Sequence, residues 1–351
     1  MKLGTCVPQG QERPRVAALC VFDGVEYLID TTAAYASALR HVDRDPLADE
    51  IAAARVPREM IALLEGGEAT LRAVKRGVDF VEQALQAGEK PQTLVDQCLL
   101  QRRSAVRLLA PIPRPPKIVG VGANYQDHIQ EGRQSGAIGN LPSYPPAFLK
   151  MPSAVVGPDE PIVYPRFGSE LDYEVEFSIV IGKRCKDVRA EQWLDVVAGY
   201  TIVNDLSLRD VILQEKDTGI VFVGKNFATS CPMGPFIVTK DEVPTPDNLA
   251  IRLKVNGELR QSDRTSSMIH SCASIVAYWS RLGLEPGDVI TTGTPGGGAG
   301  FGRKHPERLL KVGDVVEAEV EGIGVLRNHV VSDAPREPDL KRAASVTVAP
   351  V

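Results

Sequence analysis

The sequence contains no long apolar run, no cluster of basic residues and no closely spaced cysteines. A membrane-spanning helix needs about 20 consecutive apolar residues, so we expect no membrane span. The net charge of −5 is spread along the chain, which argues against a nucleic-acid partner. The N-terminal segment lacks the apolar core of a secretory signal. The six cysteines form no CxxC pair, which disfavours a disulfide framework or a zinc site and predicts a reducing, cytoplasmic location.

Aromatic residues are scarce, at 5% of the chain, whereas apolar residues reach 43% and charged residues 24%. These proportions are those of an ordinary globular protein. A chain of 351 residues is long enough for one large domain or two ordinary ones, with a core of useful size.

Proline marks an expected boundary within the chain. Residues 108–117 (LLAPIPRPPK) contain four prolines and predict an extended linker. We therefore expect an N-terminal accessory domain over residues 1–112 and a second domain over residues 117–332. The polar, Pro/Ala-rich end of the chain, residues 333–351, is expected to be a loose tail.

The two parts differ in their predicted secondary structure. Before the linker, two short strands flank the turn Asp23–Gly24, and apolar residues at helical spacing over residues 71–85 predict a helix. After the linker, short β-branched runs alternate with Gly/Pro turns, which predicts a β-rich domain. Within that domain we expect helices only near residues 187–197 and 266–282.

The segment Leu171–Gly182 (LDYEVEFSIVIG) places acids along one face of a strand that runs into the core. Alternation puts Asp172, Glu174 and Glu176 on the same face, and Ile179–Ile181 continues as an apolar strand. An ionised carboxylate buried without a partner costs several kcal/mol, against about 5–15 kcal/mol for the stability of a whole domain. The acids therefore reach solvent, take up protons or surround a cation.

Two other segments carry polar residues where sites are often built. Asp205 follows the apolar run Tyr200–Val203 at a strand end, although Asn204–Asp205 alone is also typical of a turn. His128 and Glu131 are three residues apart in GVGANYQDHIQEG, so one helical turn would bring them to the same face. A carboxylate beside an imidazole makes a general base, and an exposed surface pair is the alternative.

Eight fragments together resemble the fumarylacetoacetate hydrolase (FAH) family, in its bacterial acylpyruvase-like branch. The resemblance implies an α+β, β-rich chain, with an FAH-type mixed β-sandwich roll as the C-terminal domain and a smaller α/β N-terminal domain. It also implies a homodimer. The resemblance covers roughly residues 118–331, and its fragments are GANYQDHIQE, AFLKMPSAVVGP, LDYEVEFSIVIGK, GYTIVNDLSLRD, GKNFATSCPMGP, LKVNGELRQ, GDVITTGTPGG and VGDVVEAEVEGIGVLRN.

The resemblance implies roles for individual residues. It makes Glu174, Glu176 and Asp205 the ligands of a divalent cation, and all-oxygen ligation suits Mg²⁺ or Mn²⁺, with Ca²⁺ as an alternative. The other positions form a catalytic and a substrate-binding set. The catalytic residues would be His128, Glu131, Lys150 and Lys225. The substrate contacts would be Tyr125, Lys225, Gln214 and Thr294.

Two positions depart from the family pattern. The glutamine usually found two residues after the pair Arg209–Asp210 is missing, and Gln214 is the candidate substitute. Val221–Val223 replaces a tryptophan-like residue. Both departures bear on which substrate is bound and not on the metal site. The loop over residues 301–310 is expected at the pocket rim, and Gly296–Gly300 as a tight loop beside the pocket, because it lacks the Lys-Ser/Thr of a phosphate-binding loop.

The resemblance implies a hydrolase that cleaves a carbon–carbon bond in a β-diketo acid, such as an acylpyruvate or a fumarylacetoacetate-like acid. His128, backed by Glu131, would activate the water, and the cation would stabilise the enolate that leaves. The same site also supports decarboxylation of an oxaloacetate-like 2-oxo acid, tautomerisation, hydration, or dehydration of a sugar acid. The alternative to an enzyme is a protein that keeps this fold as a dimeric interaction module without catalytic activity. The N-terminal region would serve dimer contact or act as a lid.

Overall fold

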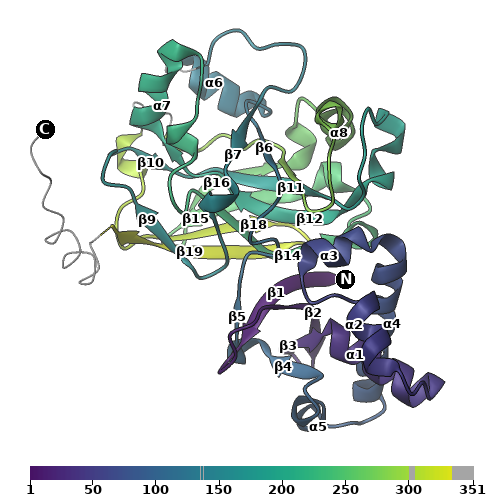
Figure 1. Ribbon diagram of the computed structural model, residues 1–351. Coiled ribbons are helices and arrows are strands. Elements are labelled where there is room, and N and C mark those ends of the chain that lie inside the picture. The colour runs from purple at the N-terminus through teal and green to yellow at the C-terminus, as the bar shows by residue number, and fades with distance from the viewer. Residues whose placement is uncertain (135, 137, 300–304, 334–351) are drawn as a thin grey trace, which may run out of the picture.

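The computed structural model describes residues 1–134, 136, 138–299 and 305–333. Residues 334–351 of the expected tail and residues 301–304 of the expected rim loop lie outside the described residues. Figure 1 shows two unequal bodies: the larger carries most of the sheets, and the smaller, at the lower right, contains the N-terminal strands and helices. The expected combination of a β-rich C-terminal region with a smaller α/β N-terminal region is confirmed.

A 12-stranded mixed sheet runs through both bodies. Its strands, in spatial order, are β4 (Leu100–Arg102), β3 (Val25–Asp30), β2 (Arg15–Phe22), β1 (Lys2–Pro8), β14 (Cys231–Thr239), β12 (Val197–Asn204), β11 (Val175–Ile181), β17 (Val289–Thr291), β6 (Ile118–Val121) and β7 (Ala147–Lys150), with β5 (Val106–Leu108) on β1 and β8 (Val155–Val156) on β14. β1 pairs antiparallel with β14, with Lys2 opposite Val238. Backbone hydrogen bonds as well as the proline-rich linker therefore join the two bodies.

A second sheet of five strands packs against the central part of the first. Its strands are β16 (Glu258–Arg264), β15 (Ala250–Val255), β18 (Val315–Val320), β19 (Gly324–Ser332) and β9 (Pro161–Tyr164). In β15 the buried and exposed residues alternate, as expected for a strand with one solvated face. Phe177 and Tyr200 of the large sheet share one buried cluster with Leu253 and Ala318 of the second sheet. A short pair, β10 (Leu171–Asp172) with β13 (Ser207–Leu208), lies at the end of β11.

The helices cover the ends and the outer faces of these sheets (Figure 1). They are α1 (Thr31–Ala38), α2 (Ala48–Arg55), α3 (Met60–Glu65), α4 (Gly67–Gln86), α5 (Pro91–Asp96), α6 (Gln126–Gln134), α7 (Arg209–Glu215) and α8 (Cys272–Trp279). The helix predicted over residues 71–85 is confirmed as α4. A Cβ on Gly77 of α4 would lie 2.6 Å from the backbone nitrogen of Tyr35, so glycine is what allows α1 to pack so closely.

The expectation of only two helical segments after the linker is wrong. Within residues 187–197 the structure has only a 3₁₀ segment, Ala190–Asp195, because Val197 already begins β12. α7 was not expected, since its β-branched residues favour strands in isolation. Tertiary packing stabilises it: a Cβ on Gly224 would lie 2.4 Å from Ile212 of α7, which shows how tightly the two segments meet.

Candidate metal centre

Three carboxylates converge where β11 and β12 meet. Glu174 precedes β11, Glu176 is the second residue of β11, and Asp205 follows β12. The antiparallel register sets Val175 opposite Asn204, which brings these positions together. Their side-chain oxygens lie within 4.8 Å of one another, and the exposed fractions of the three residues are 4%, 2% and 1%. The acids therefore do not form a solvent-facing strand surface.

Two lysines and an arginine contact these carboxylates. Lys225 Nζ donates to Glu174 Oε2 and to Asp205 Oδ2, both at 2.5 Å. Lys150 Nζ donates to Asp205 Oδ1 and to the carbonyl oxygen of Lys225, both at 2.6 Å. Arg209 donates from one terminal nitrogen to Glu174 Oε1 at 2.5 Å. Both lysines predicted for the site therefore contact expected metal ligands, and only Lys225 also lines the cavity described below.

The contact between Asp172 and Arg209 was not predicted from the sequence. Arg209 Nε donates to Asp172 Oδ2 at 2.9 Å, and Asp172 Oδ1 accepts the amide N–H of Ala299 at 3.1 Å. Burial disfavours the charge on Arg209, but Glu174 and Asp172 more than offset this, so the pKa of the guanidinium is raised. The available signal was Asp172 itself, which shares the buried strand face with the two glutamates.

Four buried carboxylates face three buried cations in this cluster, which leaves one negative charge. The carboxylates are Asp172, Glu174, Glu176 and Asp205, and the cations are Lys150, Arg209 and Lys225. Among the described residues, Glu176 has no ion pair; its Oε2 accepts the amide N–H of Gly293 at 2.9 Å. Burial, together with the charges of Asp205 and Glu174, raises the pKa of Glu176. A proton on Glu176 or a divalent cation among these oxygens would neutralise the excess negative charge, and the converging carboxylate oxygens fit such an ion.

His128 and Glu131 both lie on α6, at the mouth of this cluster. His128 is buried, and its Nε2 lies 3.8 Å from Glu174 Oε1. Burial lowers the pKa of His128 to about 4, so its imidazole is neutral at pH 7. Glu131 Oε1 accepts the amide N–H of Gly297 at 3.0 Å and so ties α6 to the glycine-rich loop.

The remaining predicted substrate contacts occupy different environments. Thr294 faces the cavity above the carboxylates and accepts a hydrogen bond from Gln261 at 2.9 Å. Tyr125 is completely buried, and its hydroxyl has no hydrogen-bond partner within the part of the chain that the structure describes. Gln214 is exposed and does not line the cavity. Two helical positions separate it from the buried Ile212, which rotates it to the opposite face of α7.

A cavity of about 380 Å³ opens above the carboxylates, a size that suits a small molecule. Its floor contains His128, Arg209 and Lys225 beside the three acids. Its walls are mainly apolar. They include Val121, Ile138, Leu141, Pro146, Ala147, Phe148, Ile212 and Val221. A site with a charged floor and apolar walls orients a polar head group and accommodates a less polar remainder.

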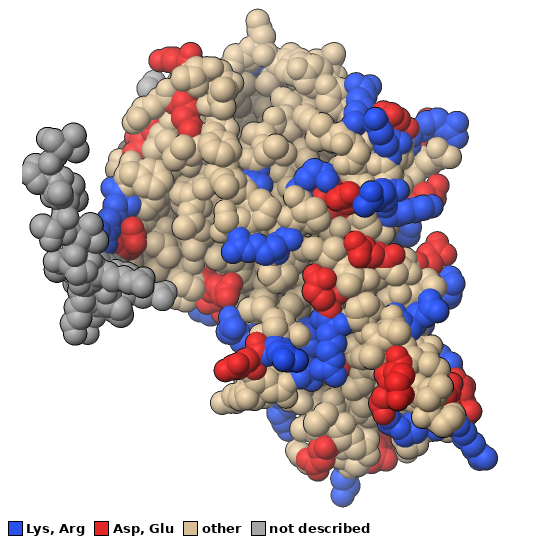
Figure 2. All heavy atoms as spheres, in the orientation of Figure 1, with Lys and Arg blue, Asp and Glu red and all other residues tan. Residues whose placement is uncertain are grey.

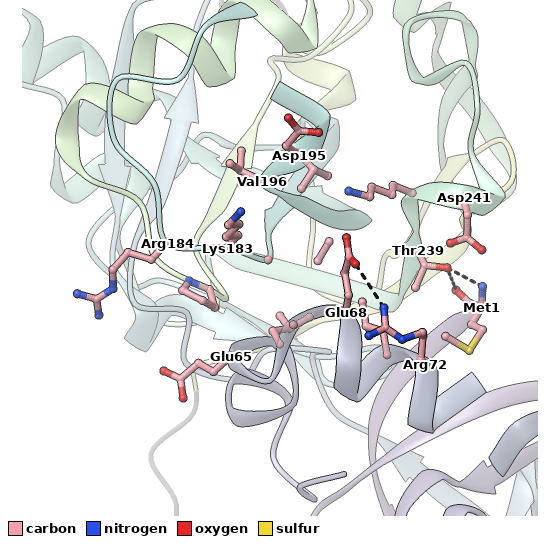
Figure 3. Close-up of a pocket in the computed structure, with 18 of the residues that line it drawn as sticks. Met1, Glu65, Glu68, Arg72, Lys183, Arg184, Asp195, Val196, Thr239 and Asp241 are labelled. Atoms are coloured by element: carbon pink, nitrogen blue, oxygen red, sulfur yellow. Dashed lines mark hydrogen bonds and ion pairs between the residues drawn. The ribbon is translucent and has the colours of Figure 1, made fainter. Parts of the chain in front are cut away.

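A larger cavity, of about 700 Å³, lies between α4 and the ends of β12 and β14 (Figure 3). It contains none of the site residues predicted from the sequence. Glu68 and Arg72 on its α4 side form an exposed ion pair of 3.4 Å with each other. Lys183 and Asp241 reach it from the opposite side (Figure 3). Its size alone therefore does not make it the chemical site.

The surface shown in Figure 2 carries acidic and basic side chains interspersed with each other. Such mixing does not provide the one-signed stripe that a nucleic-acid backbone needs. No helix in the described part of the chain is long and apolar enough to cross a membrane. All six cysteines are free thiols.

Comparisons with known proteins identify a family and individual relatives. The family model for the fumarylacetoacetate hydrolase C-terminal domain matches residues 117–331. A mitochondrial oxaloacetate tautomerase of Bos taurus is 41% identical over 277 residues, which cover 79% of this chain and 81% of that protein.

Solved structures with similar folds cover nearly the whole chain. Maleylpyruvate hydrolase from Sphingobium sp. SYK-6, in complex with manganese(II) and pyruvate, matches with a TM-score of 0.66 and 29% identity, over 95% of this chain and 100% of that chain. Fumarylacetoacetate hydrolase from Exiguobacterium antarcticum matches with a TM-score of 0.66 and 32% identity, over 95% and 99% of the two chains.

Proposed function

Because the chain belongs to the fumarylacetoacetate hydrolase family, we propose that it is a divalent-metal enzyme that acts on a small 2-oxo acid through its enolate. The observation that carries this proposal is the convergence of Glu174, Glu176 and Asp205 at the floor of a ligand-sized cavity. Buried carboxylates need protons or cations to neutralise them, and three carboxylates that converge on one point suit a divalent ion. An interaction module without catalytic function would have no use for such a cluster.

The three carboxylates are the residues that would hold the ion, and all-carboxylate ligation suits Mg²⁺ or Mn²⁺. A divalent ion bound there would polarise the oxo group of a 2-oxo acid and favour its enolate. The similar maleylpyruvate hydrolase contains manganese(II) and pyruvate, which supports both the ion and the class of substrate.

The residues around the acids supply the proton chemistry. His128 is neutral and borders the cavity, so it acts as the general base that takes a proton from the substrate or from water. Lys225 places a positive charge where negative charge develops. Glu131 holds the glycine-rich loop through Gly297 and so fixes the position of α6. The apolar walls exclude bulk water from the reacting atoms.

Keto–enol tautomerisation of an oxaloacetate-like acid is our first candidate reaction. It needs one base and an electrophile at the oxo group, and the site provides a neutral His128 and a place for the ion. The identity of 41% with a protein named oxaloacetate tautomerase, over most of both chains, supports it.

Hydrolysis of a β-diketo acid is the second candidate, supported by the fold match to two hydrolases of the family. In that reaction His128 would deprotonate a water molecule that attacks the acyl carbonyl. The two reactions share the enolate, and they differ in whether a carbon–carbon bond breaks.

One assay series separates these candidates. Metal-loaded protein is mixed with enol-oxaloacetate, and ketonisation is followed by ultraviolet absorbance; in parallel, acetylpyruvate is added and pyruvate release is measured. We expect catalysed ketonisation that falls about 10²–10⁴-fold in His128→Gln, because the general base is lost. His329→Gln, on the exposed face of β19, is the matched control. Acetylpyruvate cleavage without ketonisation would replace the first candidate by the second, and full activity of His128→Gln would refute the role of this base.

We also propose that the protein is a homodimer through an apolar rim beside this cavity, defined as Leu149, Met151, Ile220 and Phe222, which lie next to or near the lining residues Phe148 and Val221 in sequence. The exposed fractions of these residues are 56%, 43%, 66% and 47%. Asn226 donates to the carbonyl oxygens of both Leu149 and Phe222, at 3.0 and 2.8 Å, so the two segments of the rim form one surface. A contiguous exposed apolar patch of this kind marks an interface.

A further inference from the structure

The three cations of the carboxylate cluster are held in different ways. Arg209 is fixed between Asp172 and Glu174, and the amide of Ala299 holds Asp172 in turn. Lys150 is fixed by Asp205 together with a backbone carbonyl oxygen. Among the contacts of the described residues, the ammonium of Lys225 donates to two carboxylates and to no neutral group. Both hydrogen bonds of this ammonium therefore go to expected metal ligands.

Lys225 bridges two of the three expected metal ligands. Its Nζ lies 2.5 Å from an oxygen of Glu174 and 2.5 Å from an oxygen of Asp205. A divalent ion that used the same oxygens would lie close to this ammonium. Two positive charges at such a spacing inside a protein repel each other strongly, because little water screens them. The lysine and the ion therefore compete for the same carboxylates.

Lys225 also has a contact besides these two carboxylates. Lys225 lines the cavity, whereas Lys150 does not. The ring of Phe148, another cavity residue, has its centroid 5.0 Å from Lys225 Nζ, within range of a cation–π contact. The flexible four-carbon stem of lysine allows the ammonium to shift away from the carboxylates while it keeps this contact.

We propose that Lys225 is an exchangeable cation. It links Glu174 to Asp205 in this structure, and it gives up those oxygens to the ion while it keeps its contact with Phe148. There it meets the negative charge of a 2-oxo acid. The inference rests on the proposed metal site and adds an order of events: the anion-binding position of the lysine is complete only after the ion is bound.

Lysine modification tests this exchange directly. The protein is treated with formaldehyde and a borohydride reductant, with and without saturating Mg²⁺, and methylation of each lysine is read by peptide mass spectrometry. We expect Mg²⁺ to increase the methylation of Lys225 several-fold, while the buried Lys150 and the exposed Lys186 stay unchanged. In Glu176→Gln, which lacks one expected ligand, Mg²⁺ should have no effect on Lys225. Unchanged or decreased methylation of Lys225 in Mg²⁺-saturated wild type would overturn the exchange.

Binding measurements on Lys225→Met provide a second test. Removing the competing cation should tighten Mn²⁺ binding by about tenfold or more and weaken pyruvate binding to the Mn²⁺-loaded protein. A purely structural role of the lysine would not shift the two affinities in opposite directions. Isothermal titration calorimetry measures both, and Mn²⁺ binding no tighter than in the wild type would contradict the proposal. A wild-type protein that binds neither Mg²⁺ nor Mn²⁺ would overturn the metal site itself, and the exchange with it.

Discussion

Both of the cavities described above contain charged side chains, but these side chains are exposed to water in the larger cavity and buried in the smaller one. In the larger cavity the side chains of Arg72 and Arg184 are 73% and 79% exposed, so water solvates them. In the smaller cavity the side chains of Arg209 and Lys225 are 3% and 7% exposed, and carboxylates replace the water. By volume, the larger cavity would be the better candidate for the functional site. By the burial and pairing of its charged side chains, the smaller cavity is the better candidate. Desolvated charged side chains that form ion pairs with one another indicate a functional site better than cavity volume does.

The largest expected effect concerns Glu176, the acid without an ion pair among the described residues. Changing Glu176→Gln should weaken Mg²⁺ and Mn²⁺ binding more than about 100-fold, since even residues that only orient a ligand contribute about 10–100-fold. It should leave the metal-free fold intact, because the lost charge has no partner there. Isothermal titration calorimetry and thermal unfolding measure the two effects.

Glu68→Gln, in the larger cavity, is the matched control for that change. It removes an acid of the same type from an exposed helix surface and should alter neither metal affinity nor unfolding. Equal loss of metal binding in both variants would mean that the distinction between the cavities is wrong.

A second prediction compares the two arginines. Arg209→Met should destabilise the protein by about 3–5 kcal/mol, because it leaves Asp172 and Glu174 as buried charges without this partner. Arg72→Met should cost about 0–1 kcal/mol, the usual value for an exposed pair. Urea denaturation of the metal-free proteins measures both. Equal stability of the two variants would show that burial does not set the strength of these contacts.

The smallest expected effect concerns dimerisation through the residues at the borders of the two cavities. The rim of the smaller cavity is apolar, and the larger cavity is bordered by charged side chains, so we expect association only at the former. Ile220→Lys should convert the dimer to a monomer in sedimentation equilibrium, whereas Leu259→Lys, at an exposed apolar position on β16, should not. A wild-type monomer, or a dimer that survives Ile220→Lys, would reject this interface.

Much of the site could be predicted because its main elements are local in sequence. The alternation at the start of β11 and just before it places Glu174 and Glu176 on one face, and the three-residue spacing of His128 and Glu131 places them on one face of α6. The resemblance to the family added Asp205, which antiparallel pairing brings to the same place.

Other features could not be read from local patterns. Arg209 contacts Asp172 across 37 residues of sequence, through a helix that its own β-branched residues do not favour. The prediction that Gln214 contacts the substrate depended on which face of that same helix it occupies, and the structure places it on the exposed face. The predicted boundary at the proline linker also did not indicate that β1 pairs with β14, because the sequence pattern of a strand does not determine which other strand it pairs with.

That pairing has a consequence for how the protein is made. β1 leaves the ribosome early, yet its neighbour β14 follows more than two hundred residues later. Its pairs with β2 and β5 can form sooner, but the start of the edge that faces β14 keeps unpaired backbone groups until then, which invite association with other nascent chains. Closing such a distant contact is slow, so the fold should be completed only late in synthesis. Chaperone demand during translation would therefore be greatest between the emergence of these two strands.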